Sequence, residues 1–332
     1  MEKMLALAKK VAEEAEVFTV TSEDTSVQFQ ANRLKHIQSN QSTRMALRLI
    51  KQGKTGYATA TGPGGQSLVD MAVETARFGM KAEFEFPGAT PYPPVEVFDA
   101  KLEAVSLEEM TKLGETLITT LLHHTPELIC HAGVSKGVTS VNIANSRGGQ
   151  ANYRGTVFSL SVWANLINGT DMLFVGDGQS SCHPISEANT IAEVVLRQLE
   201  LAKNQAAVAT RPASALISPL MAAFNGKTVL QGASPVGGKL GQMVFDQKLW
   251  LWDDPTIAYR PTSGPCDDEG VASQRTPLVE GGVVASFLYD LQTAALAHTR
   301  STGNGHRSHG GLPAPSPSAF VIAPGSVSLL KN

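Results

Sequence analysis

The sequence predicts an α+β protein with two domains: an N-terminal domain of antiparallel sheet with helices, followed by a mostly β, barrel-like C-terminal domain. Residues 16–60 and 128–172 alternate apolar with polar side chains and are rich in Val, Thr and Phe, a pattern typical of antiparallel strands. Helical and strand patterns do not alternate regularly along the chain, which argues against a parallel βαβ fold for dinucleotide binding.

In the first half we expect an amphipathic helix over residues 1–14 and a meander of about four strands over residues 16–60. A second helix follows the glycine turn at residues 62–65. The proline-rich stretch 85–100 excludes a regular element. Ser106 and Glu109 form a capping-box pattern that begins a helix over residues 107–124. Its predicted apolar face carries Leu107, Leu113, Leu117 and Leu121.

Strand patterns resume at residue 128, with turns expected at residues 145–149 and at Asn168-Gly169. A long helix is predicted over residues 185–201. The RPAS stretch at 211–214 is the best domain boundary, and it divides the chain into residues 1–210 and 211–332. Beyond it we expect mainly strands and glycine turns, including a strand at 227–232.

Composition excludes several classes of protein. A net charge of −3 gives no basic field for nucleic acid or for an anionic membrane surface. There is no apolar run long enough to span a bilayer. The three cysteines, Cys130, Cys182 and Cys266, are scattered and form no CxxC pair, a pattern expected of a reduced, cytoplasmic protein.

Two local patterns could carry nucleophilic or metal chemistry. Cys182 precedes His183, but adjacent side chains usually point apart, so a structural role is favoured over a nucleophile pair. His298, His306 and His309 could supply imidazole ligands, although they lie in a glycine-rich stretch without a helix to align them. A solvated loop is the favoured interpretation, and a metal site is the alternative.

A third pattern is the acidic run Asp267, Asp268 and Glu269. Clustered carboxylates can bind a hard cation, and they repel one another unless they are compensated. The favoured interpretation is a turn before a strand, in which the carboxylates cap backbone N–H groups or pair with Arg275.

Four blocks of the sequence, residues 15–62, 145–172, 238–255 and 266–305, resemble the TldD/PmbA family, also called modulators of DNA gyrase. The block from CDDEG to STGNG is the most specific. The resemblance implies that residues of this block shape a cleft or a signature loop: Asp267, Asp268, Glu269, Gly270, Arg300, Gly303, Asn304 and Gly305.

TldD-type members of the family carry a zinc-binding HExxxH motif on a helix, whereas PmbA/TldE-type members share the fold without it. The stretch ALISPLMAAFNG (215–226) lies where the motif is expected, and no His, Asp, Glu or Cys occurs from Arg211 to Lys239. This chain therefore resembles the PmbA/TldE type. Its degenerate motif region comprises Leu216, Ile217, Leu220, Met221, Ala222, Phe224 and Asn225.

The resemblance implies a non-catalytic subunit of a TldD-type zinc metalloprotease that processes or degrades unfolded peptides. Zinc is expected in the TldD-type partner only, with no catalytic residue and no cofactor in this chain. Two alternatives remain: a homodimeric peptide-binding protein, and a hydrolase with a substitute metal site at the three histidines and the acidic run. Compared with the family, the C-terminal domain is expected to be incomplete at its end. Nothing in the charge or the motifs supports a direct action on DNA gyrase.

Overall fold

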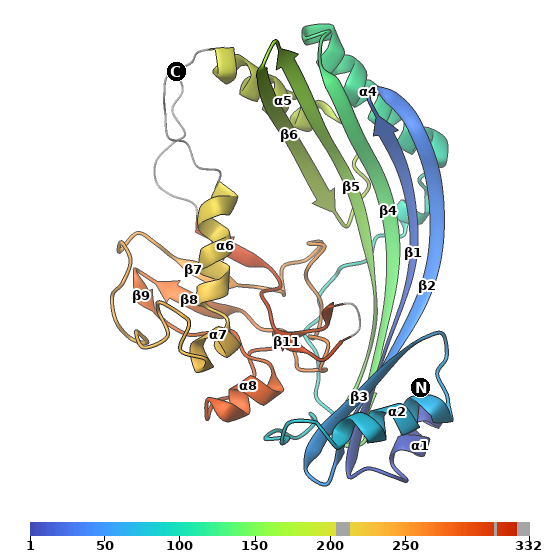
Figure 1. Ribbon diagram of the computed structural model, residues 1–332, viewed down its shortest axis with the longest axis vertical. Helices are drawn as coiled ribbons and strands as arrows, with labels where there is room; N and C mark the ends of the chain where they lie inside the picture. Colours follow the sequence, from blue (N-terminus) through green and yellow to red (C-terminus); the bar gives the residue numbers. More distant parts are fainter. Residues whose placement is uncertain (204–212, 309–310, 324–332) are drawn as a thin grey trace.

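The computed structural model describes residues 1–203, 213–308 and 311–323 (Figure 1). Its largest element is a six-stranded antiparallel sheet with the order β3-β2-β1-β4-β5-β6. Two three-stranded meanders meet where β1 pairs with β4, and the sheet is strongly curved along its long strands (Figure 1). The strands are β1 (Glu14–Gln30), β2 (Arg33–Lys51), β3 (Lys54–Thr61), β4 (Ile129–Asn145), β5 (Gln150–Asn168) and β6 (Asp171–Ser181). The predicted α+β class is confirmed.

The N-terminal meander has three long strands instead of the predicted four. Strand β1 runs without a break through the polar stretch Ser22–Ser26. It does so because β1 is a central strand there, paired with β2 on one side and with β4 on the other. Two ladders of backbone hydrogen bonds outweigh the low strand preference of Ser and Asp.

Four helices and one helical turn accompany this sheet: α1 (Glu2–Ala8), α2 (Gln66–Ala76), α3 (Lys101–Ala104), α4 (Leu107–His124) and α5 (Asn189–Lys203). Helix α1 is shorter than predicted, because β1 already begins at Glu14. The capping box of α4 is present, since Ser106 Oγ accepts from the Glu109 amide at 3.1 Å and Glu109 Oε2 accepts from the Ser106 amide at 2.7 Å. Leu107, however, is exposed, and the buried face of α4 carries Met110, Gly114, Leu117, Ile118 and Leu121. As predicted, residues 85–100 contain no helix or strand.

The remaining described residues form a smaller C-terminal unit. Its helices are α6 (Ala213–Ala223), α7 (Gly226–Leu230) and α8 (Leu291–Leu296). A four-stranded sheet has the order β12-β7-β8-β9, and β10 pairs with β11. The strands are β7 (Leu251–Asp253), β8 (Thr276–Glu280), β9 (Val283–Val284), β10 (Gly305–His306), β11 (Ala314–Pro315) and β12 (Phe320–Ile322). Phe224 lies in the core of this unit with Leu251, Leu278, Phe287 and Leu288.

One predicted strand, residues 227–232, is wrong, because Gly226–Leu230 form helix α7. Asn225 is the N-cap of this helix, and its side-chain oxygen accepts from the amides of Lys227 at 3.0 Å and Thr228 at 3.2 Å. Capping and close packing outweigh the strand preference of Thr228 and Val229. A Cβ at Gly226 would lie 2.3 Å from the Tyr289 ring, so only glycine fits here.

On each outer edge of the six-stranded sheet, a side chain occupies the backbone N–H and carbonyl of one residue. On β3, Thr75 Oγ1 accepts from the Tyr57 amide at 2.9 Å and donates to the Tyr57 carbonyl at 2.8 Å. On β6, the amide of Gln198 accepts from the Gly176 N–H at 3.0 Å and donates to its carbonyl at 3.1 Å. Occupied edge groups cannot pair with a further strand.

The C-terminal unit lies beside the lower part of the curved sheet (Figure 1). Residues 85–100 run between the two, where Tyr92 Oη donates to the Gly270 carbonyl at 3.1 Å and the Tyr259 amide donates to the Glu96 carbonyl at 2.6 Å. The predicted domain boundary falls partly at residues 204–212, outside the described residues, and stays a prediction. Across the described residues, every helix is too short or too polar to cross a membrane.

Candidate functional site

The acidic loop Asp267–Gly270 lies at the junction between the sheet and the C-terminal unit. Asp267 is buried and accepts from three backbone amides: those of Glu269 at 2.9 Å, Val271 at 2.9 Å and Gly305 at 2.8 Å. Gly270 closes the turn with a φ of +72°, a conformation that favours glycine. The predicted capping of backbone N–H groups is therefore present, and it ties the CDDEG segment to the STGNG segment.

The arginine partners of the loop are Arg48 and Arg307, not the predicted Arg275. Arg48 donates to Glu269 Oε1 at 2.5 Å and to Glu16 Oε2 at 3.2 Å. Arg307 pairs with the other oxygen of Glu16, and its backbone amide donates to Asp268 Oδ2 at 2.7 Å. Arg275 instead lies over the Trp252 ring, 4.1 Å from its centroid.

These residues form a chain of buried charges that we call the ionic junction: Glu16, Arg48, Glu269 and Arg307. The side chains of all four are at most 3% exposed. Two arginines offset two glutamates, so the junction itself is close to neutral. Because Glu16 and Arg48 belong to the sheet and Glu269 and Arg307 to the C-terminal unit, the junction joins the two parts.

Burial shifts the pKa of most groups around the junction. It raises the pKa of Asp267 well above its ordinary value, and the charge of Glu269 adds to the rise while three backbone N–H groups oppose it. Burial also raises the pKa of Glu269, against the opposing charge of Arg48. Burial alone would lower the pKa of Arg48, but the carboxylates of Glu16 and Glu269 raise it above its ordinary value.

The other predicted signature residues are distributed differently. Asn304 is buried, and its amide donates to Asp253 Oδ2 at 2.7 Å. A Cβ at Gly305 would lie 2.3 Å from Glu269 Oε2, and one at Gly303 would lie 2.9 Å from the Ala272 carbonyl. Gly303, Asn304 and Gly305 therefore have structural roles in the packing of the loop, whereas Arg300 is exposed.

The three candidate metal histidines are not gathered into one described site. His298 is exposed and has a φ of +54°. His306 Nε2 is hydrogen-bonded to Ser318 Oγ at 2.7 Å, and its Nδ1 lies 3.9 Å from Asp268 Oδ2. His309 lies outside the described residues. Among the residues that the structure describes, no three His, Cys, Asp or Glu side chains lie close enough to hold a metal ion.

The surroundings of Cys182 and His183 favour a structural role over a nucleophile pair. Cys182 is buried, and burial raises the pKa of its thiol, which disfavours the reactive thiolate. His183 Nδ1 is 2.7 Å from Asp99 Oδ2, a partner that the sequence did not indicate.

The degenerate motif region is helical. Leu216, Ile217, Leu220, Met221 and Ala222 lie on α6, and Phe224 and Asn225 join it to α7. Pro219 lies inside α6. Phe224 is fully buried in the C-terminal core, and Asn225 caps α7 and donates to the Pro315 carbonyl at 2.5 Å.

Sequence reasoning missed Glu16, Arg48 and Arg307. A signal for the first two was available, because Glu16 lies directly opposite Arg48 in the β1–β2 register. Arg48 also interrupts MALRLI, a strand segment whose residues are all buried. Arg307 carries no comparable local signal.

Comparison with known proteins completes the description of the site. A family model described as PmbA/TldA metallopeptidase domain 1 matches residues 15–77, and one described as the PmbA/TldA metallopeptidase C-terminal domain matches residues 204–331. The chain belongs to the PmbA/TldD metallopeptidase family. The first match covers Glu16 and Arg48, and the second covers Glu269 and Arg307, so the ionic junction links the two family domains.

Relatives of this PmbA/TldD family chain include an uncharacterized protein of Methanocaldococcus jannaschii. It is 30% identical over an alignment of 336 positions that covers 97% of this chain and 78% of the relative. A metalloprotease of Methanothermobacter thermautotrophicus is 24% identical, over 95% of this chain and 73% of its own. The crystal structure of TldE from Thermococcus kodakarensis has the same fold, with a TM-score of 0.89 at 20% identity, over 99% of this chain and 78% of that one.

Proposed function

We propose that this chain is a non-catalytic, PmbA/TldE-like subunit of a TldD-type zinc metalloprotease that processes or degrades unfolded peptides. One observation carries the proposal. Between Arg211 and Lys239, where HExxxH is expected in a TldD-type chain, the sequence has no His, Asp, Glu or Cys. Proteins hold zinc with imidazole, thiolate and carboxylate groups, so this segment has nothing with which to bind it.

The acidic loop supports this assignment, because its carboxylates already have structural partners. Asp267 accepts three backbone N–H groups, Asp268 accepts the Arg307 amide, and Glu269 accepts Arg48 and the Leu291 amide at 2.7 Å. A metal ion at these oxygens would have to displace the bonds that join the two parts of the chain. A substitute hydrolytic site at the acidic run is thus disfavoured.

In this proposal the catalytic zinc belongs to a partner subunit that carries HExxxH, and this chain contributes binding surface. The complex would act in the cytoplasm, a reducing compartment, which is compatible with three buried cysteines that form no disulfide. A peptide would not extend the six-stranded sheet at its edges where Thr75 and Gln198 occupy them.

Co-expression with an HExxxH-bearing relative from the same genome, followed by affinity capture and a peptide-cleavage assay, tests the proposal. We expect a complex of the two chains that cleaves unfolded peptide, while this chain alone does not. As a matched control, replacing the glutamate of the partner's HExxxH by Gln should abolish cleavage and leave the complex intact. If the two chains do not associate and this chain forms a stable homodimer, the proposal is wrong and a homodimeric binding protein replaces it.

A further inference from the structure

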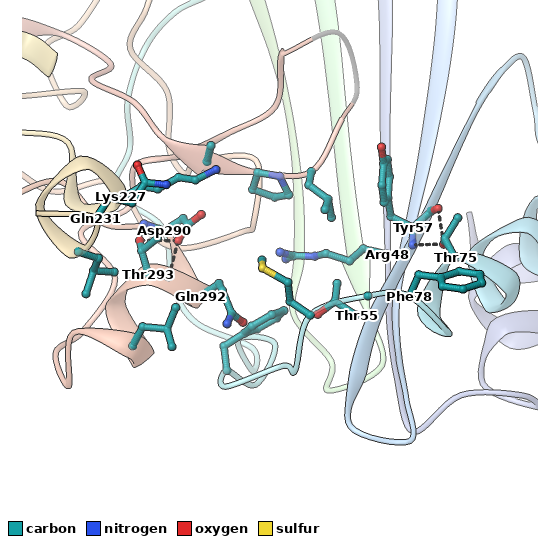
Figure 2. A pocket seen from close by; sticks show the side chains of 18 residues that line it. Arg48, Thr55, Tyr57, Thr75, Phe78, Lys227, Gln231, Asp290, Gln292 and Thr293 are labelled. Atoms are coloured by element: carbon teal, nitrogen blue, oxygen red, sulfur yellow. Dashed lines mark hydrogen bonds between the residues drawn. The ribbon is translucent and has the colours of Figure 1, made fainter. Parts of the chain in front are cut away.

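A cavity of about 520 Å³ lies between the sheet and the C-terminal unit (Figure 2). Strands β2 and β3, residues 75–84, helices α7 and α8 and residues 312–314 contribute to its walls. A volume of this size is typical of sites that hold a small ligand or several side chains.

The rim of the cavity is apolar and exposed. Five large apolar side chains from four segments surround it, with exposed fractions of 91% for Phe78, 68% for Met80, 47% for Leu296, 42% for Leu230 and 38% for Leu312. Single exposed apolar residues are ordinary on protein surfaces, but their convergence around one cavity marks a binding site.

Two polar groups of opposite charge face this apolar space. Asp290 uses Oδ1 to accept from the Thr293 amide at 2.7 Å and hydroxyl at 2.6 Å, and its other oxygen points toward the cavity (Figure 2). Lys227 extends along the cavity from α7 (Figure 2). Within the described part of the chain, its ammonium group forms no hydrogen bond or ion pair.

A third polar group lies at the back of the cavity. Arg48 lines it and is 2% exposed, and its Nε is a buried donor without a partner among the described residues. Because Glu269 and Glu16 hold its guanidinium and Phe84 and Phe86 lie against it, Arg48 forms part of the cavity wall and is not a contact group for a ligand.

We propose that this cavity binds a short apolar run of an extended peptide. In this arrangement apolar side chains enter the cavity, Asp290 accepts from a backbone N–H, and Lys227 donates to a backbone carbonyl. The Asp290 carboxylate and the Lys227 ammonium group carry opposite charges. Together they fit an uncharged peptide group, which has both a donor and an acceptor, better than they fit a ligand with a single charge. The inference rests on the proposed function for the origin of the peptide, since unfolded substrates expose such runs.

The test uses the full chain and two fluorescein-labelled peptides that differ only in the centre: Gly-Ser-Gly-Leu-Phe-Leu-Gly-Ser-Gly and the same peptide with Ser-Ser-Ser in the middle. Fluorescence anisotropy measures the dissociation constant. We expect the Leu-Phe-Leu peptide to bind and the serine peptide to bind at least about tenfold more weakly. The variants Met80→Lys and Leu296→Lys should each weaken binding by about tenfold, because they place a charge on the apolar rim.

Trp163→Lys is the matched control, since Trp163 is 68% exposed on β5 and does not line the cavity. It should bind the Leu-Phe-Leu peptide as the wild type does. Equal binding of both peptides, unchanged binding by the two rim variants, or loss of binding in Trp163→Lys would each overturn the inference. Circular dichroism melting curves confirm that the compared variants are folded.

The experiments can distinguish failure of this inference from failure of the proposed function. Rim variants should still be captured by the HExxxH partner, because the inference concerns peptide binding only. Peptide binding at the rim, combined with failure to associate with any HExxxH-bearing chain, would contradict the subunit proposal and support the cavity. Association with the HExxxH partner, combined with unchanged peptide binding by the rim variants, would support the subunit proposal and contradict the cavity.

Discussion

Arg48 and Glu269, 221 residues apart in the chain, form a buried hydrogen bond of 2.5 Å between Nη1 and Oε1. Arg48 belongs to the first family domain and Glu269 to the C-terminal one. Because Arg48 also holds Glu16, one side chain neutralises carboxylates from both parts of the molecule. The ionic junction therefore fixes the placement of the C-terminal unit against the sheet, and with it the walls of the cavity.

Removing Arg48 tests this role. Arg48→Met would leave Glu269 without an arginine partner, because Arg307 pairs with Glu16, and an uncompensated buried charge typically costs about 3–5 kcal/mol. Urea denaturation should show the loss as a lower unfolding midpoint. Arg77→Met is the control, because Arg77 pairs with Glu74 at 3.0 Å on the surface, where a pair contributes about 0–1 kcal/mol. Equal effects of the two substitutions would show that the junction does not stabilise the fold.

Gly305 is predicted to tolerate no side chain. In Gly305→Ala the new Cβ would lie 2.3 Å from Glu269 Oε2, and this carboxylate cannot move aside because Arg48 and the Leu291 amide hold it. We expect a loss of about 1–3 kcal/mol in the free energy of unfolding, as for other overpacked sites. Gly238→Ala, where nothing lies within 4 Å of the added Cβ, should change stability far less. A Gly305→Ala protein as stable as the Gly238→Ala protein would contradict the packing described here.

Gln198 is predicted to protect the edge of β6. Gln198→Ala would free the N–H and the carbonyl of Gly176, and unpaired edge groups favour association with another strand. Light scattering after size-exclusion chromatography should detect concentration-dependent self-association of this variant. Arg197→Ala, at the exposed neighbouring position on the same helix, serves as the control and should behave as the wild type. A monodisperse Gln198→Ala protein would show that this side chain is not needed to block the edge.

The Asp99–His183 pair makes a pH-dependent contribution to stability. The hydrogen bond from His183 is the main reason why the pKa of Asp99 lies below its ordinary value of 3.8, and the Lys101 amide adds to this effect. A carboxyl group whose pKa is lowered by folding stabilises the fold above its unfolded pKa, and this stabilisation is lost as pH falls through the folded value. Below pH 3.8 the wild type should therefore lose its advantage over Asp99→Asn. Urea denaturation of both proteins between neutral and acidic pH measures the difference, and a constant difference would rule out the coupling.

Local signals in the sequence predicted much of the sheet and several helices. Ser106 and Glu109 marked the start of α4, and Asn168-Gly169 marked a turn where Gly169 has a φ of +64°. Such signals are short-range, because the residues that make the contact lie within a few positions of each other. They failed where a neighbouring strand or a tertiary contact decided the outcome, as for the uninterrupted β1 and for helix α7.

The candidate site was predictable only in part. The acidic run and the glycines after it stood out as a signature, but the arginine partner of Glu269, Arg48, lies on a strand far away in the sequence. Arg48 resembles an ordinary strand residue until its opposition to Glu16 is considered, and Arg307 lies in a stretch that suggested histidine chemistry instead. The cavity draws its walls from several separate segments, so no single stretch of sequence could have revealed it.

The most direct measurement of the central proposal is the zinc content of this chain, purified alone and in complex with an HExxxH-bearing relative, by mass spectrometry of the metal. The account predicts zinc well below stoichiometry in the isolated chain and stoichiometric zinc in the complex, unchanged when His306 of this chain is replaced by Ala. Stoichiometric zinc in the isolated chain, lost in His306→Ala, would contradict it and would place a metal site in this chain itself.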